Sequence, residues 1–277
     1  MATIYQVAER AGVSLSTVSR VLNGKTTVNA TLKAKVEKAM LELNYRPNSV
    51  ARSLATSRSD SVGILVSELN TPFFGDLMQG VESTLRVADK HVIITVGHNN
   101  LETEQDAVEF LISRNCDALI MHAEAMRDED LVALNEKRLP IALVNRQVTG
   151  LENNCIALDN EKGGYLATSH LLELGHKDIA YISGPMKIRD ACHRLKGHKR
   201  ALEEAGVPYN PMLTYEGNYE EEDGKIGLLE LLSRDTPFSA LVCANDWMAS
   251  GAMSCARDLG MSLPQDLSIV GFDDVVF

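Results

Sequence analysis

The sequence predicts an α/β fold that follows a small all-helical head at the N-terminus. Three observations support this: helical periodicity up to about Leu43, apolar runs alternating with helical patterns after the head, and an uneven distribution of charge. A chain of 277 residues with 45% hydrophobic composition is long enough for about two domains. We expect a head at 1–45, a hinge or linker at 46–60, and a core at 61–277.

Charge separates the head from the core. Residues 1–60 hold nine Lys/Arg against four acidic residues, a net charge of +5, although the whole chain carries −11. Only the head therefore has the charge that favours contact with phosphates. This distribution is typical of a nucleic-acid reader joined to an acidic sensor.

The first helix of the head is predicted to begin at Ile4. Thr3-Ile4-Tyr5-Gln6 has the Thr-x-x-Gln form of a capping box, in which Thr3 caps the helix. The helix should end near Gly12, where glycine accommodates a tight turn, and small Ala8 allows the next helix to approach. This pattern predicts a helix-turn-helix.

The second helix is predicted from about Leu15 to Leu22, with Ser14 as its cap. Its outward side chains are placed to contact DNA: Leu15, Ser16 and Arg20 at base edges, Thr17 and Ser19 at phosphates. A third helix carrying Leu32, Val36, Ala39 and Leu43 on one stripe would complete the core of the head. The alternative is a three-helix module that binds another protein.

The core is predicted as two successive series of strands and helices. The first series has strands at 62–66, 92–96, 118–121 and 141–144, with helices at 74–88, 102–112 and 130–137. The second has strands at 155–158, 179–182, 212–215, 240–243 and 267–270, with helices at 163–174, 194–205, 224–232 and 248–259. Such alternation predicts parallel sheets in two lobes, about 61–159 and 160–277. A ligand is expected in the cleft beyond the carboxyl ends of the strands.

Several function classes lack support in the sequence. The five cysteines are odd in number and form no CxxC pair, and the scattered histidines make no metal pair on one helical face. GxGxxG, P-loop, HExxH and GxSxG motifs are absent, so we expect neither an enzyme nor a cofactor. No apolar signal core or run of about 18 apolar residues occurs, which predicts a cytoplasmic protein without a membrane partner.

The head resembles a known family. IYQVAERAGVSLSTVSRVLN (Ile4 to Asn23) is similar to the signature of the lactose/galactose repressor family of bacterial transcription regulators. In the core, SELNTPFFGDLMQGVE, CANDWMASGAM and SIVGFDD resemble the galactose repressor and isorepressor branch. The resemblance implies a two-lobe core like that of periplasmic binding proteins, a homodimer, double-stranded operator DNA as partner, and repression modulated by a small sugar such as galactose. Another sugar, a nucleoside or a purine stays open as effector, as does a solute-binding protein that does not bind DNA.

The resemblance also implies roles for individual residues. NYRPNSVARSLAT (Asn44 to Thr56) is similar to the family's hinge helix, which inserts a leucine into the minor groove; the matching residue is Leu54, and packing on the core is the alternative. The DNA-binding residues would be Thr3, Ser14, Leu15, Ser16, Thr17, Ser19, Arg20, Asn23, Asn48, Ser49, Arg52 and Leu54.

Eight residues would line the effector cleft: Phe73, Phe74, His122, Asn145, Arg146, Arg194, Asn245 and Asp273. Their donors, acceptors and aromatic faces suit a polyol. Phe73 and Phe74 could instead belong to the core, and His122 and Asn145 could cap strand ends. Arg194, Asn245 and Asp273 are expected at strand-to-helix or strand-to-loop junctions, where a charge must be paired or face a ligand.

Two features set limits on the resemblance. Arg146 stands where other family members have an aromatic or small residue, which leaves the effector open. Family members also continue beyond the segment SIVGFDD, so we expect a core that is incomplete at its C-terminus, with weakened packing, dimerisation and effector response.

Overall fold

The computed structural model describes residues 2–22, 28–46, 58–136 and 139–275. They form two compact units, Met1–Ser61 with Ile112–Asp117 and Val62–Leu111 with Ala118–Phe277. Most of the expected linker, 47–57, lies outside the described residues. The head and the core are described separately below.

The head consists of three helices: α1 (Ile4–Ala11), α2 (Leu15–Leu22) and α3 (Ala30–Glu42). Thr3 caps α1 in a reciprocal capping box with Gln6, and Gly12 ends the helix at φ 64°. Both features confirm the prediction, because the left-handed conformation at Gly12 favours glycine. Five buried residues form the core of the head: Val7, Ala8, Val18, Val36 and Ala39.

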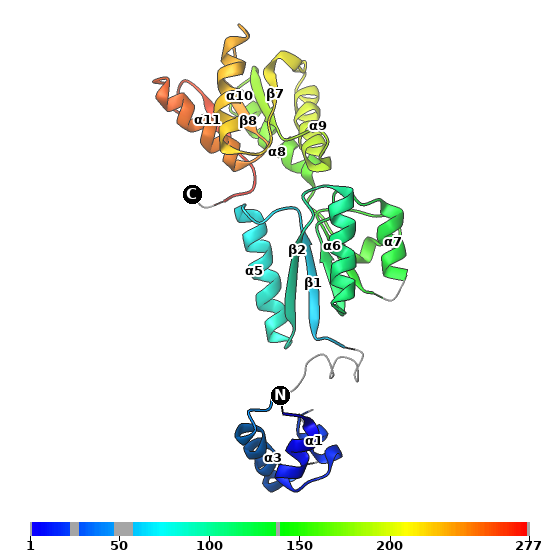
Figure 1. The fold of residues 1–277 in the computed structure, drawn as a ribbon. Coiled ribbons are helices and arrows are strands. Elements are labelled where there is room, and N and C mark those ends of the chain that lie inside the picture. The colour runs from blue at the N-terminus through cyan, green and yellow to red at the C-terminus, as the bar shows by residue number, and fades with distance from the viewer. Residues whose placement is uncertain (1, 23–27, 47–57, 137–138, 276–277) are drawn as a thin grey trace. The chain divides into compact units, whose positions relative to one another are not determined.

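The core begins with a five-stranded sheet in the order β2-β1-β3-β4-β5, which together with α5–α7 makes the first lobe (Figure 1). Each pair with a resolved register is parallel. The strands are β1 (Ser61–Val66), β2 (His91–Val96), β3 (Ala118–Met121), β4 (Ile141–Val144) and β5 (Cys155–Ile156). The helices are α5 (Pro72–Val87), α6 (Leu101–Ser113) and α7 (Asp128–Glu136), and the 3-10 helix η1 spans Glu152–Asn154.

Successive residues of β1 face opposite sides of this sheet, and a helix packs against each side. Ile64 and Val66 pack with Phe74 of α5 on one face. On the other face, a Cβ at Gly63 would meet Leu111 of α6, so the position must stay small. Figure 1 accordingly shows α5 and α6 on opposite sides of the strands. This sandwich fixes where the carboxyl ends of the strands lie.

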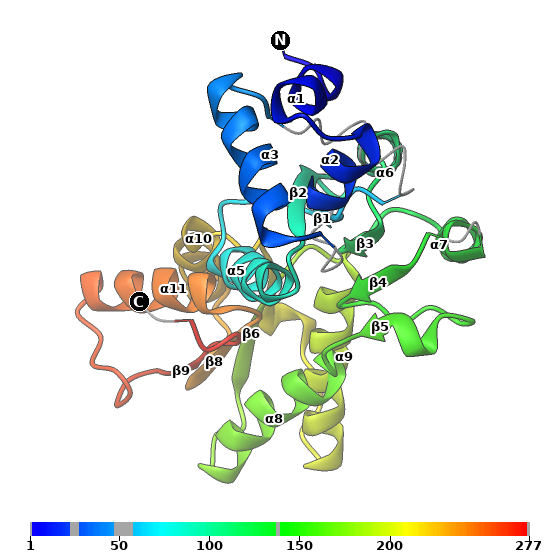
Figure 2. The same ribbon diagram turned by 90° about the horizontal axis from the view of Figure 1, so that it is seen from below.

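The second lobe contains a four-stranded sheet in the order β7-β6-β8-β9, again with parallel pairing (Figure 2). Its strands are β6 (Ile179–Ser183), β7 (Thr214–Glu216), β8 (Ala240–Cys243) and β9 (Ser268–Val270). Its helices are α8 (Asn160–Glu173), α9 (Arg189–Glu204), α10 (Glu221–Ser233) and α11 (Asp246–Asp258), with the 3-10 helix η2 at Pro211–Leu213. The predicted parallel sheets are thus present in both lobes.

Glycines allow the backbones of neighbouring helices in the second lobe to touch where the helices cross. A Cβ at Gly164 of α8 would clash with the backbone of Arg194, and one at Gly197 of α9 with the carbonyl of Glu161. The same reciprocal arrangement joins Gly224 of α10 and Gly251 of α11. Because only glycine fits, each pair sets the distance between two helix backbones. The first pair also holds Arg194 in place.

Two predicted boundaries in the second lobe are wrong. Helix α9 begins at Arg189 and not at Arg194, so Arg194 lies inside the helix and not at a junction. The strand expected to begin at Met212 begins at Thr214, because Pro211 starts a 3-10 turn that Asn210 caps. The other strands and helices lie within a few residues of their predicted positions.

Candidate functional site

Helix α2 presents a polar, exposed surface in the head. Leu15, Ser16 and Arg20 are exposed, while Val18 of the same helix is fully buried. Among the described residues, Arg20 forms no ion pair, whereas Arg10 of α1 is paired with Glu42 at 2.7 Å. The guanidinium of Arg20 is therefore available to an external partner.

Three hydroxyl groups gather at the start of α2. Ser14 Oγ accepts from Thr17 N at 3.2 Å, which caps the helix as predicted. The same oxygen lies 2.8 Å from Ser16 Oγ and 2.9 Å from Thr17 Oγ1. Hydroxyl groups at a helix N-terminus are suited to bind an anion such as a DNA phosphate. Thr3 is also exposed, but its side chain is occupied by the capping box.

Of the remaining DNA-binding residues implied by the sequence, one lies on α2 and five lie outside the described residues. Ser19 of α2 is half-buried. Asn23 and the hinge residues Asn48, Ser49, Arg52 and Leu54 lie outside the described residues.

In the core, side chains of the two lobes meet beyond the strand ends. Asn145 follows β4 of the first lobe, and its Nδ2 donates to Asp190 of α9 in the second. Asn160 of α8 donates to the other oxygen of Asp190 at 2.9 Å. The backbone of Asn145 is left-handed, with φ 59°. Asn145 therefore serves as a link between the lobes, beyond any role as a strand cap.

Arg194 is the centre of a buried network in the second lobe. Its Nε donates to Asn160 Oδ1 at 2.7 Å, and Nη1 donates to the carbonyl of Ala244 and to Asp273 at 3.4 Å. The guanidinium also lies over the ring of Phe272, 3.7 Å from its centroid. A buried charge needs such partners, and the network leaves Arg194 little freedom to reorient.

Two other predicted residues of the second lobe are held firmly. Asn245 caps α11 by accepting from Met248 N at 2.9 Å, and its Nδ2 donates to the carbonyl of Tyr219. Asp273 has a φ of 104°, a conformation that a residue other than glycine adopts at a cost of about 1–3 kcal/mol. Burial raises the pKa of Asp273 to about 6, although Arg194 acts in the opposite direction.

In the first lobe, His122 and Phe74 pack together. Their ring centroids are 5.0 Å apart, and Phe73 stacks edge-on against Phe74 at 5.1 Å. Phe74 is buried on the sheet, as the core alternative allowed, while Phe73 is 43% exposed. Ser67 Oγ donates to Asn99 and lies 2.8 Å from His122 Nδ1. Burial lowers the pKa of His122 to about 4, so its ring is neutral at pH 7.

The guanidinium of Arg146 forms its hydrogen bonds within the first lobe. It donates to the carbonyls of Ala123 and Met126 and to Asp128. From the other side, the buried carboxylate of Glu104 accepts from the backbone amides of residues 124–126 at 2.8–3.1 Å. Arg146 and Glu104 therefore clamp the loop that follows β3.

That loop carries Glu124, which the sequence reasoning missed. The side chain of Glu124 is 9% exposed, and its Oε1 is 3.8 Å from His122 Nε2. Burial and the neighbouring Asp190 raise the pKa of Glu124 to about 7. Burial also raises the pKa of Asp190. Carboxyl groups from both lobes thus crowd together.

The sequence reasoning also missed Asp190, Asn160 and Tyr219. Tyr219 has a buried Oη without a hydrogen-bond partner among the described residues, and burial raises its pKa. These residues belong to different helices or loops, so no local pattern connects them. The backbone of Tyr219 is left-handed with φ 70°, a conformation that the sequence does not reveal.

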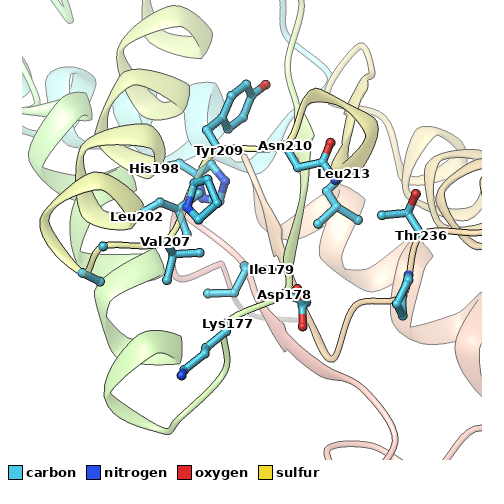
Figure 3. A pocket seen from close by; sticks show the side chains of 14 residues that line it. Lys177, Asp178, Ile179, His198, Leu202, Val207, Tyr209, Asn210, Leu213 and Thr236 are labelled. Carbon is cyan, nitrogen blue, oxygen red and sulfur yellow. The ribbon is translucent and has the colours of Figure 1, made fainter.

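A separate cavity of about 400 Å³ opens at the other end of the second-lobe strands (Figure 3). Its wall includes His198, Tyr209 and Thr236. Thr168 holds His198 Nδ1 at 2.9 Å, and burial lowers the pKa of His198 to about 3. This cavity lies beside Ile179, the first residue of β6, and so at the amino ends of the strands. It is not the cleft that the strand ends predict.

Comparison with known protein families shows which family this chain belongs to. A model described as bacterial regulatory proteins of the lacI family matches residues 3–48, and one described as periplasmic binding proteins and sugar binding domain of the LacI family matches residues 59–276. The chain belongs to the LacI family. The resemblance found in the sequence is therefore confirmed, and with it the two-lobe α/β fold.

Individual LacI-family relatives cover the whole chain. The HTH-type transcriptional regulator GalR of Escherichia coli K12 is 41% identical over 276 residues, which is 100% of this chain and 80% of that protein. The ribose operon repressor of Haemophilus influenzae is 35% identical and covers 99% of this chain and 82% of its own length. A lac repressor dimer bound to operator and the anti-inducer ONPF superposes with a TM-score of 0.88 at 32% identity, over 99% of this chain and 83% of that one. These findings make the chain a transcriptional regulator of the galactose repressor branch.

The described residues provide neither a metal-binding cluster nor a membrane-spanning helix. They contain no group of three or more His, Cys, Asp or Glu residues arranged to hold a metal ion. No helix in the described ranges has the length and apolar character needed to cross a membrane.

Proposed function

We propose that this LacI-family chain is a cytoplasmic repressor that binds operator DNA as a homodimer and releases it when a small sugar binds between the lobes of the core. The observation that carries the proposal is that one chain contains both features: an exposed polar face on α2 of the head, and polar contacts between Asn145 and Asp190 that connect the two lobes of the core. The GalR relative and the operator-bound lac repressor dimer support it. No chemical step is needed for this function.

In the head, the proposed roles follow exposure and chemistry. Leu15, Ser16 and Arg20 would contact base edges, and Ser14 and Thr17 would contact phosphates. Two heads of a dimer would read two half-sites of a pseudo-palindromic operator, because a single helix reaches only one half-site. The hinge residues Asn48, Ser49, Arg52 and Leu54, and Asn23, keep the roles that the family resemblance implies.

In the core, the proposed effector contacts differ in part from those expected. Asn145, Arg194, Asn245 and Asp273 remain proposed effector contacts, and the hydrogen bonds and burial of Asp190 and Tyr219 support adding these two residues. Phe73 offers an exposed ring that could face a sugar, and His122 supports the wall. We assign Arg146 to the loop after β3 and not to the effector.

A gel-shift titration tests the DNA-binding proposal. Operator affinity should fall steeply between two salt concentrations, because bound phosphates release counterions. Arg20→Ala should cost about 1–3 kcal/mol and relax base preference, whereas Lys35→Ala, on the exposed surface of α3, serves as the matched loss of one charge. Equal affinity and equal base preference of the Arg20 variant and the wild type would remove Arg20 from the readout.

A further inference from the structure

The carboxyl group of Glu124 is buried in the effector cleft without a donor. Its side chain is 9% exposed, and no described residue donates a hydrogen bond to its oxygens. The nearest cationic or imidazole group is His122 Nε2 at 3.8 Å. Ser67 Oγ donates to Asn99 and so accepts from His122 Nδ1, which leaves a lone pair on Nε2. Glu124 therefore faces an acceptor and lacks a donor.

The arginines near Glu124 are engaged elsewhere. Arg146 donates to two backbone carbonyls and to Asp128. Arg194 donates to Asn160, to a carbonyl and to Asp273. Arg189 is half exposed and lies 3.8 Å from Asp128. None of the three arginines pairs with Glu124 in the described residues, although the buried Nε of Arg146 has no hydrogen-bond partner there.

Acidic and unpartnered groups surround the same space. Among the described residues, Asp190 accepts hydrogen bonds only from the neutral amides of Asn145 and Asn160. Tyr219 Oη is buried and lacks a hydrogen-bond partner among the described residues. Crowding and burial raise the pKa of Glu124 to about 7 and also raise the pKa of Asp190. Among the described residues, neither Glu124 nor Asp190 forms an ion pair with a lysine or arginine, although the unpartnered hydroxyl of Tyr219 could still donate a hydrogen bond.

We propose that the effector is an amino sugar, whose protonated amine binds the buried carboxylate of Glu124 and lies next to Asp190. The inference rests on the proposed function of the cleft and names the class of sugar. An ammonium group brings three donors and a positive charge, and so could form the ion pair that Glu124 and Asp190 do not form with any described lysine or arginine. A hydroxyl group of a neutral sugar brings one donor and leaves the excess negative charge uncompensated.

Calorimetric titration of the full chain tests the proposal with four probes: D-galactosamine, D-glucosamine, and the N-acetyl form of each. Acetylation keeps the sugar ring but removes the charge on nitrogen. We expect at least one free amine to bind about tenfold to hundredfold more tightly than its N-acetyl form, which is the range of a charge-assisted hydrogen bond. Glu124→Gln should abolish this preference, while Glu129→Gln, on the exposed surface of α7, should keep it.

Proton release provides a second readout in the wild type. At pH 6.5 part of the Glu124 carboxyl is protonated, and an ammonium favours the ionised form, so binding should release protons into the buffer. The heat of binding should then vary with the ionisation enthalpy of the buffer. The charged groups that face Glu124 are Glu104, Arg146, Asp190 and Arg189, and His122 stays neutral at this pH. Asp190 and Asp273 can also release protons, so the difference between wild type and Glu124→Gln isolates Glu124.

Several results would overturn the inference. These are equal or tighter binding of the N-acetyl forms or of plain galactose, binding of none of the sugars, a preference that survives Glu124→Gln, or binding of the amine without proton release. If Glu124→Gln fails to fold, the comparison of free and acetylated amines in the wild type still tests whether the effector is an amino sugar. Operator binding in a gel shift is measured separately: a repressor that releases DNA with galactose alone would retain the proposed function and lose this inference.

Discussion

At the scale of single residues, the buried carboxylate of Glu124 destabilises the unliganded protein. Its pKa is raised by burial from an ordinary value of 4.5 to about 7. A carboxyl whose pKa is higher in the folded state binds its proton more tightly there, so the penalty is absent below pH 4.5 and grows until the pH passes about 7. Residues that sacrifice stability in a cleft are typical of binding sites.

Glu124→Gln should therefore stabilise the unliganded protein, and more at pH 8 than at pH 5. The gain should be at most about 3 kcal/mol, the equivalent of the full pKa shift. Urea unfolding at the two pH values measures it. Glu129→Gln, whose side chain is 84% exposed, should change stability by less than about 0.5 kcal/mol at either pH. A destabilised Glu124 variant at pH 8 would show that the carboxylate has a partner in solution.

Arg146 is predicted to matter for stability and, indirectly, for effector binding. Arg146→Met leaves the buried carbonyls of Ala123 and Met126 without donors, which should cost about 2–4 kcal/mol. Because the same loop carries Glu124, effector affinity should fall with stability, while operator binding stays intact. Arg127→Met is the control, since the ion pairs of Arg127 with Glu129 and Asp130 lie at the surface. Equal melting temperatures for the two variants would contradict the clamp.

Sequence alone could locate part of this site. His122 and Asn145 stand directly after predicted strands, so their position at the carboxyl end of a sheet follows from topology. The sequence could not reveal that Arg146 points into its own lobe, because that depends on the course of the loop at 123–128. Nor could it show that Glu124 and Asp190, 66 positions apart, lie close together in the folded core.

At the scale of elements, hydrophobic periodicity and caps predicted most helices and strands. Helix α1 has a capping box and a glycine at its end, and its bounds agree with the prediction. Helix α9 lacks these signals: Ile188 stands at its N-cap without a side-chain hydrogen bond, and the first turns are polar. The sequence therefore predicts a start for α9 that is five residues too late. Its true position is set by packing against α8 and by Gly197.

Replacing Gly197 with alanine tests the close crossing of α8 and α9. A Cβ there would come closer than 3.0 Å to the carbonyl of Glu161, so the helices must separate, at a cost of about 1–3 kcal/mol or more. Gly80→Ala in α5 is the matched substitution, since no heavy atom lies within 4 Å of its added Cβ. Alanine at Gly80 should stabilise by up to about 1 kcal/mol through helix propensity. Chemical unfolding of both variants should give opposite signs.

At the scale of the whole molecule, effector and operator binding must be linked in both directions. If a saturating sugar weakens operator affinity by some factor, saturating operator must weaken sugar affinity by the same factor. Calorimetry of the sugar with and without operator, compared with gel shifts with and without sugar, measures the two factors. Asp190→Asn weakens the contact between the lobes at Asn145 and should reduce both factors together. Because linkage requires the two factors to be equal, unequal values would mean that one titration had not reached equilibrium, whereas factors unchanged in Asp190→Asn would contradict a role of this contact in the coupling.

The four glycines at the helix crossings of the second lobe have a consequence for evolution. Gly164, Gly197, Gly224 and Gly251 touch backbone and not the cleft, yet each lacks room for even a methyl group. In a saturation mutagenesis survey scored by repression, these four positions should tolerate as few substitutions as the effector contacts. A family that changes its effector can exchange side chains such as Glu124 freely, provided that these glycines are inherited unchanged. The specificity of the cleft can therefore drift, while the lobe that supports it cannot.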